Sequence, residues 1–340
     1  MTTRRLLFPQ VRHATWETYD VPTEPEPHTI TAQAVCSLIS VGTELALYMG
    51  THIGFTLPEP PFPMMPHRPG YALVGRVTAV GNEVEAIRPG ERVLMEAPHG
   101  SAAAVDVRHT SVLPLPDELG DAEATLIRMA GIALTALRVA PLQLGETVVV
   151  FGLGLVGQLA TQLFRLNGGH PVIGIDRLPS RLAIAQANGA LTLNADEVDV
   201  PAEVAHLTLG RGPDVVVEAT GSPAVVPLAL NLVTKGGRVV LLGSTRGQAE
   251  IDVYSHIHRK GVRVIGAHES VQNLDLVPGV CWTKARNLQL LADLFVQGQL
   301  RSQGLISHTI RPADLPAIYE ALADRPHDYL GVLVDWQDDV

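Results

Sequence analysis

The sequence predicts an α/β protein with two domains, a β-rich domain followed by a doubly wound parallel sheet. Three observations support this. Before about residue 120, short strand-like runs alternate with proline- and glycine-rich stretches; after it, strand and helix patterns alternate; and a glycine-rich turn follows the first strand of the second part. We therefore expect one domain over 1–120, completed by the tail 306–340, and a second over 121–305.

In the first domain, three runs read as strands: ITAQAV (30–35), YALVGRVTAV (71–80) and ERVLMEA (91–97). Proline-rich stretches between them predict long loops. The tail shows an amphipathic helix pattern around 315–322 and a strand-like run, GVLVDW, at 331–336.

The second domain shows six strand-like runs joined by five crossovers, the pattern of a parallel sheet with helices on both faces. The last crossover, Thr245 to Gly261, is weakly patterned, and its helix is the least certain of the five. The runs begin at Val148, Val172, Ala190, Asp214, Arg238 and Val262.

The turn after the first of these strands predicts a dinucleotide site. It reads Gly-x-Gly-x-x-Gly, with glycines at 152, 154 and 157, and a helix pattern begins at Leu155 and Val156. Such glycines allow a tight reversal, close approach of a pyrophosphate and close packing of helix on strand, while the first helical amides face the phosphates.

The acidic residue that ends the next strand predicts the cofactor. Asp176 lies 19 residues after Gly157, near the position where an acid binds the adenosine ribose. A carboxylate there accepts ribose hydroxyls and repels a 2′-phosphate, so NAD is favoured. The neighbouring Arg177 could instead tolerate that phosphate. Ligands also bind at the carboxyl ends of parallel strands, and five further residues stand there as cofactor contacts: Thr220, Gly243, Ser244, Ala267 and His268.

Composition excludes several classes of partner. The net charge of −10 argues against nucleic acid, and no apolar run has the length of a membrane span or signal peptide. The two cysteines, Cys36 and Cys281, are far apart and indicate reduced thiols. We expect a cytoplasmic enzyme whose partner is a small-molecule substrate.

Five segments together resemble the medium-chain dehydrogenase/reductase family of zinc alcohol, sorbitol and threonine dehydrogenases. The resemblance implies a GroES-like catalytic domain, a Rossmann domain, and a substrate cleft between them. Among zinc-lacking members, the chain looks most similar to the branch around bacteriochlorophyllide a dehydrogenase. The matching segments are VGTELALYMG (41–50), PGYALVGRVTAVGNEV (69–84), RPGERV (88–93), DVVVEATGSP (214–223) and KGGRVVLLG (235–243).

The zinc site of that family is not retained. Relatives place cysteine, a histidine–glutamate pair and a second cysteine where this chain has Val41, the pair Tyr71 and Ala72, and Met129. None offers a thiolate, imidazole or carboxylate. The four-cysteine lobe of many relatives is impossible with two cysteines, so no bound metal is expected.

Without zinc, side chains must handle the proton and steady the alkoxide. The resemblance places Thr43 at the hydroxyl of a proton relay and Tyr71 in the vacated metal pocket, while each could also be structural. His52 and His67 lie in loops that line the family's cleft, and either could be the base. Glu44 is read as structural. Arg128 is expected to bind an anionic group of the substrate, to help hold the pyrophosphate, or to form a salt bridge at the helix surface.

The predicted function is a zinc-independent, NAD-dependent dehydrogenase acting on a secondary alcohol or ketone, such as a polyol, sugar or cyclitol. One alternative is a zinc-free enoyl or quinone reductase, although such enzymes usually prefer NADPH. Another is a dinucleotide-binding protein without catalysis. The apolar strand at 262–268 forms a sheet edge, which predicts a homodimer or homotetramer.

Overall fold

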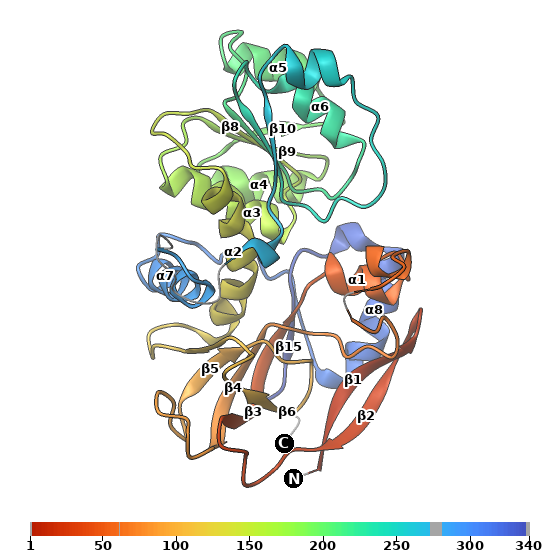
Figure 1. Ribbon diagram of the computed structural model, residues 1–340, viewed down its shortest axis with the longest axis vertical. Helices are drawn as coiled ribbons and strands as arrows, with labels where there is room; N and C mark the ends of the chain where they lie inside the picture. The colour runs from red at the N-terminus through yellow and green to blue at the C-terminus, as the bar shows by residue number, and fades with distance from the viewer. Residues whose placement is uncertain (1, 61, 273–280, 338–340) are drawn as a thin grey trace. The chain divides into compact units, whose positions relative to one another are not determined.

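The computed structural model describes residues 2–60, 62–272 and 281–337. The chain divides into two compact units (Figure 1). The first comprises residues 1–128, 284–296 and 306–340, and the second comprises 129–283 and 297–305. The division falls within helix α2 (Asp121–Val139), eight residues after the predicted boundary, and helix α7 (Lys284–Val296) joins the first unit rather than the second.

A seven-stranded sheet forms the centre of the first unit, in the order β14-β15-β3-β4-β5-β7, with β6 also paired to β3. The predicted strand runs appear as β3, β4 and β5, and the two patterns of the tail as α8 and β15. Strand β15 pairs antiparallel with β3, placing Val332 opposite Ile39. A separate hairpin joins β1 (Thr2–Gln10) and β2 (His13–Asp20).

The elements of this unit have the following bounds: β3 Thr29–Ile39, α1 Thr43–Tyr48, β4 Leu73–Val80, β5 Arg92–Met95, β6 Ala102–Asp106, β7 Val112–Pro114, β14 His308–Ile310, α8 Leu315–Asp324 and β15 Val332–Asp335. Short 3₁₀ turns cover Ile53–Phe55, Pro312–Asp314 and Pro326–Asp328.

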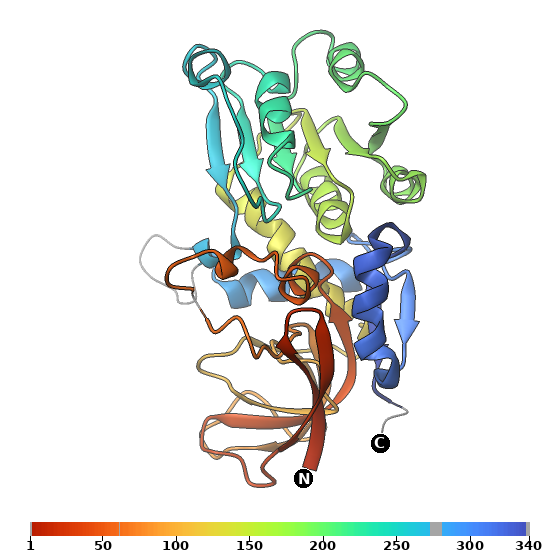
Figure 2. The same ribbon diagram turned by 90° about the vertical axis from the view of Figure 1, so that its right-hand side faces the viewer.

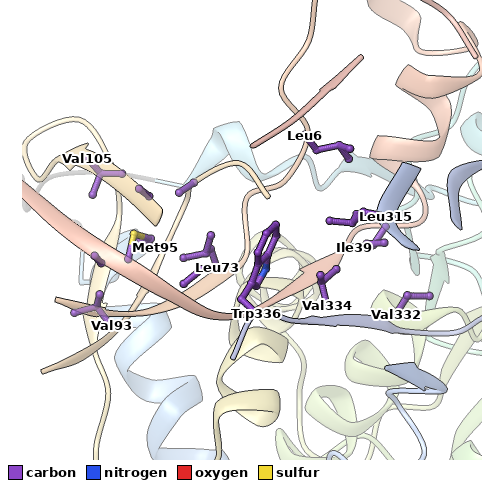
Figure 3. Close-up of a cluster of buried hydrophobic side chains, with 14 of the residues drawn as sticks. Leu6, Ile39, Leu73, Val93, Met95, Val105, Leu315, Val332, Val334 and Trp336 are labelled. Carbon is purple, nitrogen blue, oxygen red and sulfur yellow. The ribbon is translucent and has the colours of Figure 1, made fainter. Parts of the chain in front are cut away.

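Apolar side chains from strands far apart in the sequence form the core of the first unit (Figure 3). Leu6, Leu73 and Trp336 are almost fully buried there although they come from β1, β4 and the end of the chain. Each buried side chain of this size contributes about 1.5–3 kcal/mol. The tail is therefore part of this core.

The second unit is a six-stranded parallel sheet in the order β10-β9-β8-β11-β12-β13, with helices over it (Figure 2). This confirms the predicted doubly wound fold. The sequence order reverses between β8 and β11, the type of position where such sheets bind ligands. The strands are apolar because both faces are covered; all four residues of β8 and of β11 are buried.

Its elements are β8 Val148–Phe151, α3 Leu155–Leu166, β9 Val172–Asp176, α4 Pro179–Ala187, β10 Leu191–Asn194, α5 Val200–Leu207, β11 Val215–Glu218, α6 Val225–Leu232, β12 Arg238–Leu241 and β13 Arg263–Gly266. The weakly patterned last crossover contains only a short π-helical turn, Val253–His258, in place of a regular helix. A 3₁₀ turn covers Glu269–Val271.

Candidate functional site

The three glycines of the turn after β8 have different structural roles. Gly152 has φ +85°, and a Cβ there would lie 2.7 Å from Thr220 Cγ2. A Cβ on Gly157 would lie 1.9 Å from the carbonyl oxygen of Gly152, so this glycine lets α3 pack on the turn. Gly154 has φ −63° and nothing within 4 Å of a Cβ. Only at Gly154 does the fold itself leave room for a side chain.

The carboxylate of Asp176 accepts hydrogen bonds from this turn and from the residues that follow Asp176. Oδ2 accepts the Leu153 amide at 2.7 Å, and Oδ1 accepts the amides of Arg177 at 2.8 Å and Leu178 at 3.0 Å. The Arg177 guanidinium is exposed and pairs with Asp196 at 2.8 Å. The carboxylate is thus fixed at the turn, while the arginine is bound to a surface acid.

A buried glutamate organises the ends of the next two strands. Glu218, at the end of β11, accepts the amides of Thr220 and Gly221 at 2.7 and 2.9 Å on Oε1 and the Thr245 hydroxyl at 2.9 Å on Oε2. A Cβ on Gly243 would lie 2.4 Å from the Gly221 amide nitrogen. The loops after β11 and β12 are therefore joined through Glu218, whose role the sequence pattern did not reveal.

The remaining predicted cofactor contacts differ in their surroundings. Ser244 belongs to the loop after β12 and lies close to Gly221, because a Cβ on Gly221 would meet the Ser244 carbonyl oxygen at 3.1 Å. Ala267 is buried, whereas His268 is exposed and its Nδ1 accepts the Ser270 amide at 3.2 Å. His268 caps a short turn in the described structure. Leu155 and Val156 begin α3, as predicted.

In the first unit, three hydroxyls gather between the end of β3 and the start of β4, and we call Ser40, Thr43 and Tyr71 the hydroxyl cluster. Tyr71 Oη donates a hydrogen bond to Ser40 Oγ, and the Thr43 side chain also hydrogen-bonds Tyr71. Burial raises the pKa of Tyr71 to about 12, so the phenol keeps its proton at neutral pH. The sequence singled out Thr43 and Tyr71, and Ser40 is an addition from the structure.

Glu44 is buried next to this cluster. Its Oε1 accepts the Ser40 amide at 2.8 Å, and its Oε2 lies 3.0 Å from His99 Nε2 and accepts the Tyr319 hydroxyl. Desolvation, and then the Glu44 charge, raise the pKa of Tyr319 well above its usual value. His99 and Tyr319 were missed because they are 55 and 275 residues away from Glu44, and no local pattern connects them.

Arg128 is part of a buried ion pair rather than one at the helix surface. Its Nε lies 2.7 Å from Glu96 Oε1, which also binds Lys284 Nζ at 2.5 Å. The Arg128 guanidinium lies 5.0 Å from the centre of the Tyr71 ring, where its positive charge lowers the pKa of that phenol against the larger effect of burial. The arginine therefore acts on the hydroxyl cluster.

The two candidate histidines, His52 and His67, both lie beside the ring of Phe62. The Phe62 centroid is 5.9 Å from the His52 ring and 5.7 Å from the His67 ring. His52 Nδ1 accepts the Gly54 amide at 3.1 Å. Burial lowers the pKa of His67, which favours its neutral form. We call His52, Phe62 and His67 the ring platform.

The positions that bind zinc in relatives do not fit the metal here. Val41 packs against the apolar core, and Ala72 is buried and pairs through its carbonyl with the Leu38 amide. Tyr71 keeps its phenolic proton, and Met129 offers only a thioether. Over the described ranges, no group of three His, Cys, Asp or Glu side chains could hold a metal ion.

Comparison with known proteins places the chain in a family. Residues 156–274 match the family model described as "Zinc-binding dehydrogenase". The (R,R)-butanediol dehydrogenase of Bacillus subtilis (strain 168) is 30% identical over 240 residues, which cover 62% of this chain and 69% of the relative. D-guloside 3-dehydrogenase of Shigella flexneri is 26% identical over 259 residues, covering 75% and 73%.

A solved structure shares the fold of this chain. The crystal structure of 2R,3R-butanediol dehydrogenase from Bacillus subtilis superposes with a TM-score of 0.82 at 23% identity, covering 98% of this chain and 99% of that one. The chain belongs to the medium-chain dehydrogenase/reductase family, among the zinc-type alcohol dehydrogenase-like members. It is an oxidoreductase of the dinucleotide-binding dehydrogenase type. Among the helices described, none is both long and apolar enough to cross a membrane.

Proposed function

We propose that this protein is an NAD-dependent, zinc-independent dehydrogenase that interconverts a secondary alcohol and its ketone. The observation that carries the proposal is the hydroxyl cluster, in which Tyr71 stands where the family resemblance puts a metal ligand of relatives. The cluster supplies hydrogen-bond donors, held by a buried carboxylate, in place of a Lewis acid.

Each side chain takes a role that matches its environment. Bound NAD supplies the hydride-accepting ring. Burial keeps the Tyr71 phenol protonated; its single proton, which points to Ser40 Oγ in this structure, turns to the substrate oxygen when substrate binds and steadies its alkoxide character. His67, favoured in its neutral form, is the group we assign to accept the hydroxyl proton, and His52 is the alternative on the other side of Phe62. Thr43 orients Tyr71.

The ring platform supports a cyclic polyol, sugar or cyclitol as the substrate. Phe62 is 37% exposed and is flanked by two imidazoles. The apolar face of a sugar-like ring can stack on a phenyl group, and imidazole nitrogens can bond its hydroxyls. Relatives that act on a diol and on a guloside are consistent with this class.

Two other functions compete with this one. A zinc-free enoyl or quinone reductase would also work without a metal. Such enzymes usually prefer NADPH, however, and the fixed carboxylate of Asp176 disfavours that cofactor. A dinucleotide-binding protein without catalysis would not need the hydroxyl cluster.

We further propose that the protein works in the cytoplasm as a homodimer or homotetramer.

The test is a panel of cyclic polyols, linear polyols, ketones and enones, followed through the absorbance of reduced nicotinamide. We expect oxidation of cyclic secondary alcohols with NAD, persistence of activity in strong chelators, and no stoichiometric zinc by elemental analysis.

Tyr71→Phe should lower kcat about a hundredfold, as expected for loss of one oxyanion donor. Tyr48→Phe is the control, since its hydroxyl donates only to the Arg12 carbonyl. Turnover of enones alone, or one zinc per chain lost together with activity, would refute the proposal.

A further inference from the structure

The buried carboxylate of Glu44 links the hydroxyl cluster to His99 and Tyr319. Only 1% of its surface is exposed, and it is bound by the Ser40 amide, His99 and the Tyr319 hydroxyl. A carboxylate removed from water is costly unless donors replace the lost hydration. These three groups supply that replacement, so each of them determines where the carboxylate lies.

The direction of the hydrogen bonds behind His99 can be assigned. The indole of Trp336 can only donate, and its Nε1 lies 2.9 Å from Ser37 Oγ. The proton of Ser37 is then available for His99 Nδ1 at 2.8 Å, which leaves the ring proton on Nε2, facing Glu44. A one-way series of donors therefore runs from Trp336 to the carboxylate.

The opposite end of the carboxylate fixes the hydroxyl cluster. Glu44 Oε1 accepts a hydrogen bond from the Ser40 amide, and Ser40 Oγ accepts one from the Tyr71 hydroxyl. Thr43 directly precedes Glu44 at the start of α1. If Oε2 lost a donor, the carboxylate could turn and release the Ser40 backbone.

We propose that His99 is a positioning residue: acting through Glu44 and Ser40, it fixes the direction in which the Tyr71 phenol is held. This rests on the proposed function, in which Tyr71 meets the substrate oxygen. His99 itself is fully buried and contacts the site only through Glu44.

The first test compares His99→Gln with His99→Leu. Glutamine can present an amide N–H where the imidazole has Nε2, whereas leucine fills similar space without a donor. We expect kcat to stay within about threefold of wild type in H99Q and to fall about tenfold or more in H99L, the effect of losing one bond to a charged group. KM for NAD should not change, since the nucleotide turn belongs to the other compact unit.

A second pair of variants covers the case in which H99L does not fold. Tyr319→Phe keeps a ring that packs at 4.9 Å from Phe8 but removes the donor to Glu44, while Tyr48→Phe changes a tyrosine of the same ring cluster that does not bond Glu44. We expect kcat to fall in Y319F and to remain unchanged in Y48F.

Amide hydrogen exchange at Ser40 tests the positioning without any substrate. The amide should exchange slowly in wild type and H99Q and at least tenfold faster in H99L and Y319F. If wild type oxidises no alcohol, the proposed function fails while this measurement still decides the role of His99. Equal kcat and equal exchange in H99L and H99Q, or in Y319F and Y48F, would overturn the inference.

Discussion

At the scale of single residues, the carboxylate of Asp176 is fixed by the backbone, and we propose that it also binds the cofactor. Three backbone amides occupy three of its acceptor positions, and Arg181 Nη1 lies 3.9 Å from Oδ2. A carboxylate has about four lone-pair sites, so it can still accept a ribose hydroxyl. The 2′-phosphate of NADP would be repelled by this negative charge, and the three backbone hydrogen bonds would keep the carboxylate from moving away.

This geometry predicts the cofactor preference. Wild type should bind NAD at least about tenfold more tightly than NADP, because charge-assisted hydrogen bonds contribute roughly 1.5–3 kcal/mol each. Asp176→Ser should weaken NAD binding and narrow the preference. Arg177→Ala should change the preference by less than about threefold, since that guanidinium already pairs with Asp196. Titration of both cofactors against the three proteins is the measurement, and tighter binding of NADP by wild type would contradict it.

At the scale of elements, the fold requires glycine at two of the three positions in the turn between β8 and α3, and we propose that the third, Gly154, is glycine because of the ligand. A side chain at Gly157 would collide with the backbone of Gly152, while a side chain at Gly154 would meet nothing within 4 Å. The motif alone does not distinguish these roles, because all three positions are glycine.

We therefore expect Gly157→Ala and Gly154→Ala to behave differently. G157A should lower the melting temperature of the protein without cofactor by several degrees, since the backbone must shift. G154A should leave that temperature unchanged and weaken NAD binding about tenfold or more, because its methyl group would occupy the approach of the pyrophosphate. Calorimetry with and without NAD measures both effects. Unaltered NAD affinity in G154A would show that the turn does not hold the pyrophosphate.

The β1–β2 hairpin offers a prediction about pH. Glu17 on β2 binds Arg68 through both carboxylate oxygens at 2.7 Å and Arg5 at 2.6 Å. The hydrogen bond from Arg68 is the largest cause that lowers the pKa of Glu17, to about 2 from 4.5. Because the folded-state pKa is depressed, this stabilisation is present above pH 4.5 and is lost as the pH falls through about 2.

Glu17→Gln should accordingly lower the free energy of unfolding by about 1 kcal/mol at pH 7, a value reduced for the partial exposure of the site. The difference from wild type should shrink as the pH falls through the same window. Glu83→Gln, at an exposed position in the same unit, is the control. Denaturant unfolding at several pH values provides the measurement, and a difference that persists at pH 2 would argue against the ion pairs.

At the scale of the whole molecule, the parallel sheet has two edges that look alike in composition. Strand β13 ends the sheet on one side and exposes 42% of Val264, and β10 ends it on the other and exposes 45% of Leu191. Val253 and Tyr254, in the crossover that precedes β13 in the sequence, are also exposed. Pairing of two copies along β13 would cover this apolar edge.

We expect sedimentation at micromolar concentration to show at least a dimer of the 36.4 kDa chain. Val264→Glu should shift the protein toward the monomer, because the charge would be buried in the pairing. Leu191→Glu should leave the assembly unchanged. A wild type that sediments only as monomer would refute pairing through β13, as would an equal effect of both variants.

Much of this architecture was predictable from sequence. The strand runs in both units, the glycine turn and Asp176 depend on local patterns, and the parallel sheet of the second unit follows from the alternation of strands and helices. The last crossover was the exception: its weak pattern corresponds to one π-helical turn, since few of its side chains are buried. The division within α2 was also unpredictable, because one uninterrupted helix passes from one unit to the other.

The sequence by itself determined the class of fold and the dinucleotide turn, since each is a property of residues adjacent or regularly spaced in the chain. The loss of the family's metal ligands is a prediction that rests on the family resemblance. Only the tertiary structure decided what surrounds Tyr71. It brought His99 and Tyr319 to Glu44, and Glu96 and Lys284 to Arg128. These contacts join residues tens to hundreds of positions apart, and packing of the core, not local pattern, selects which buried charges meet.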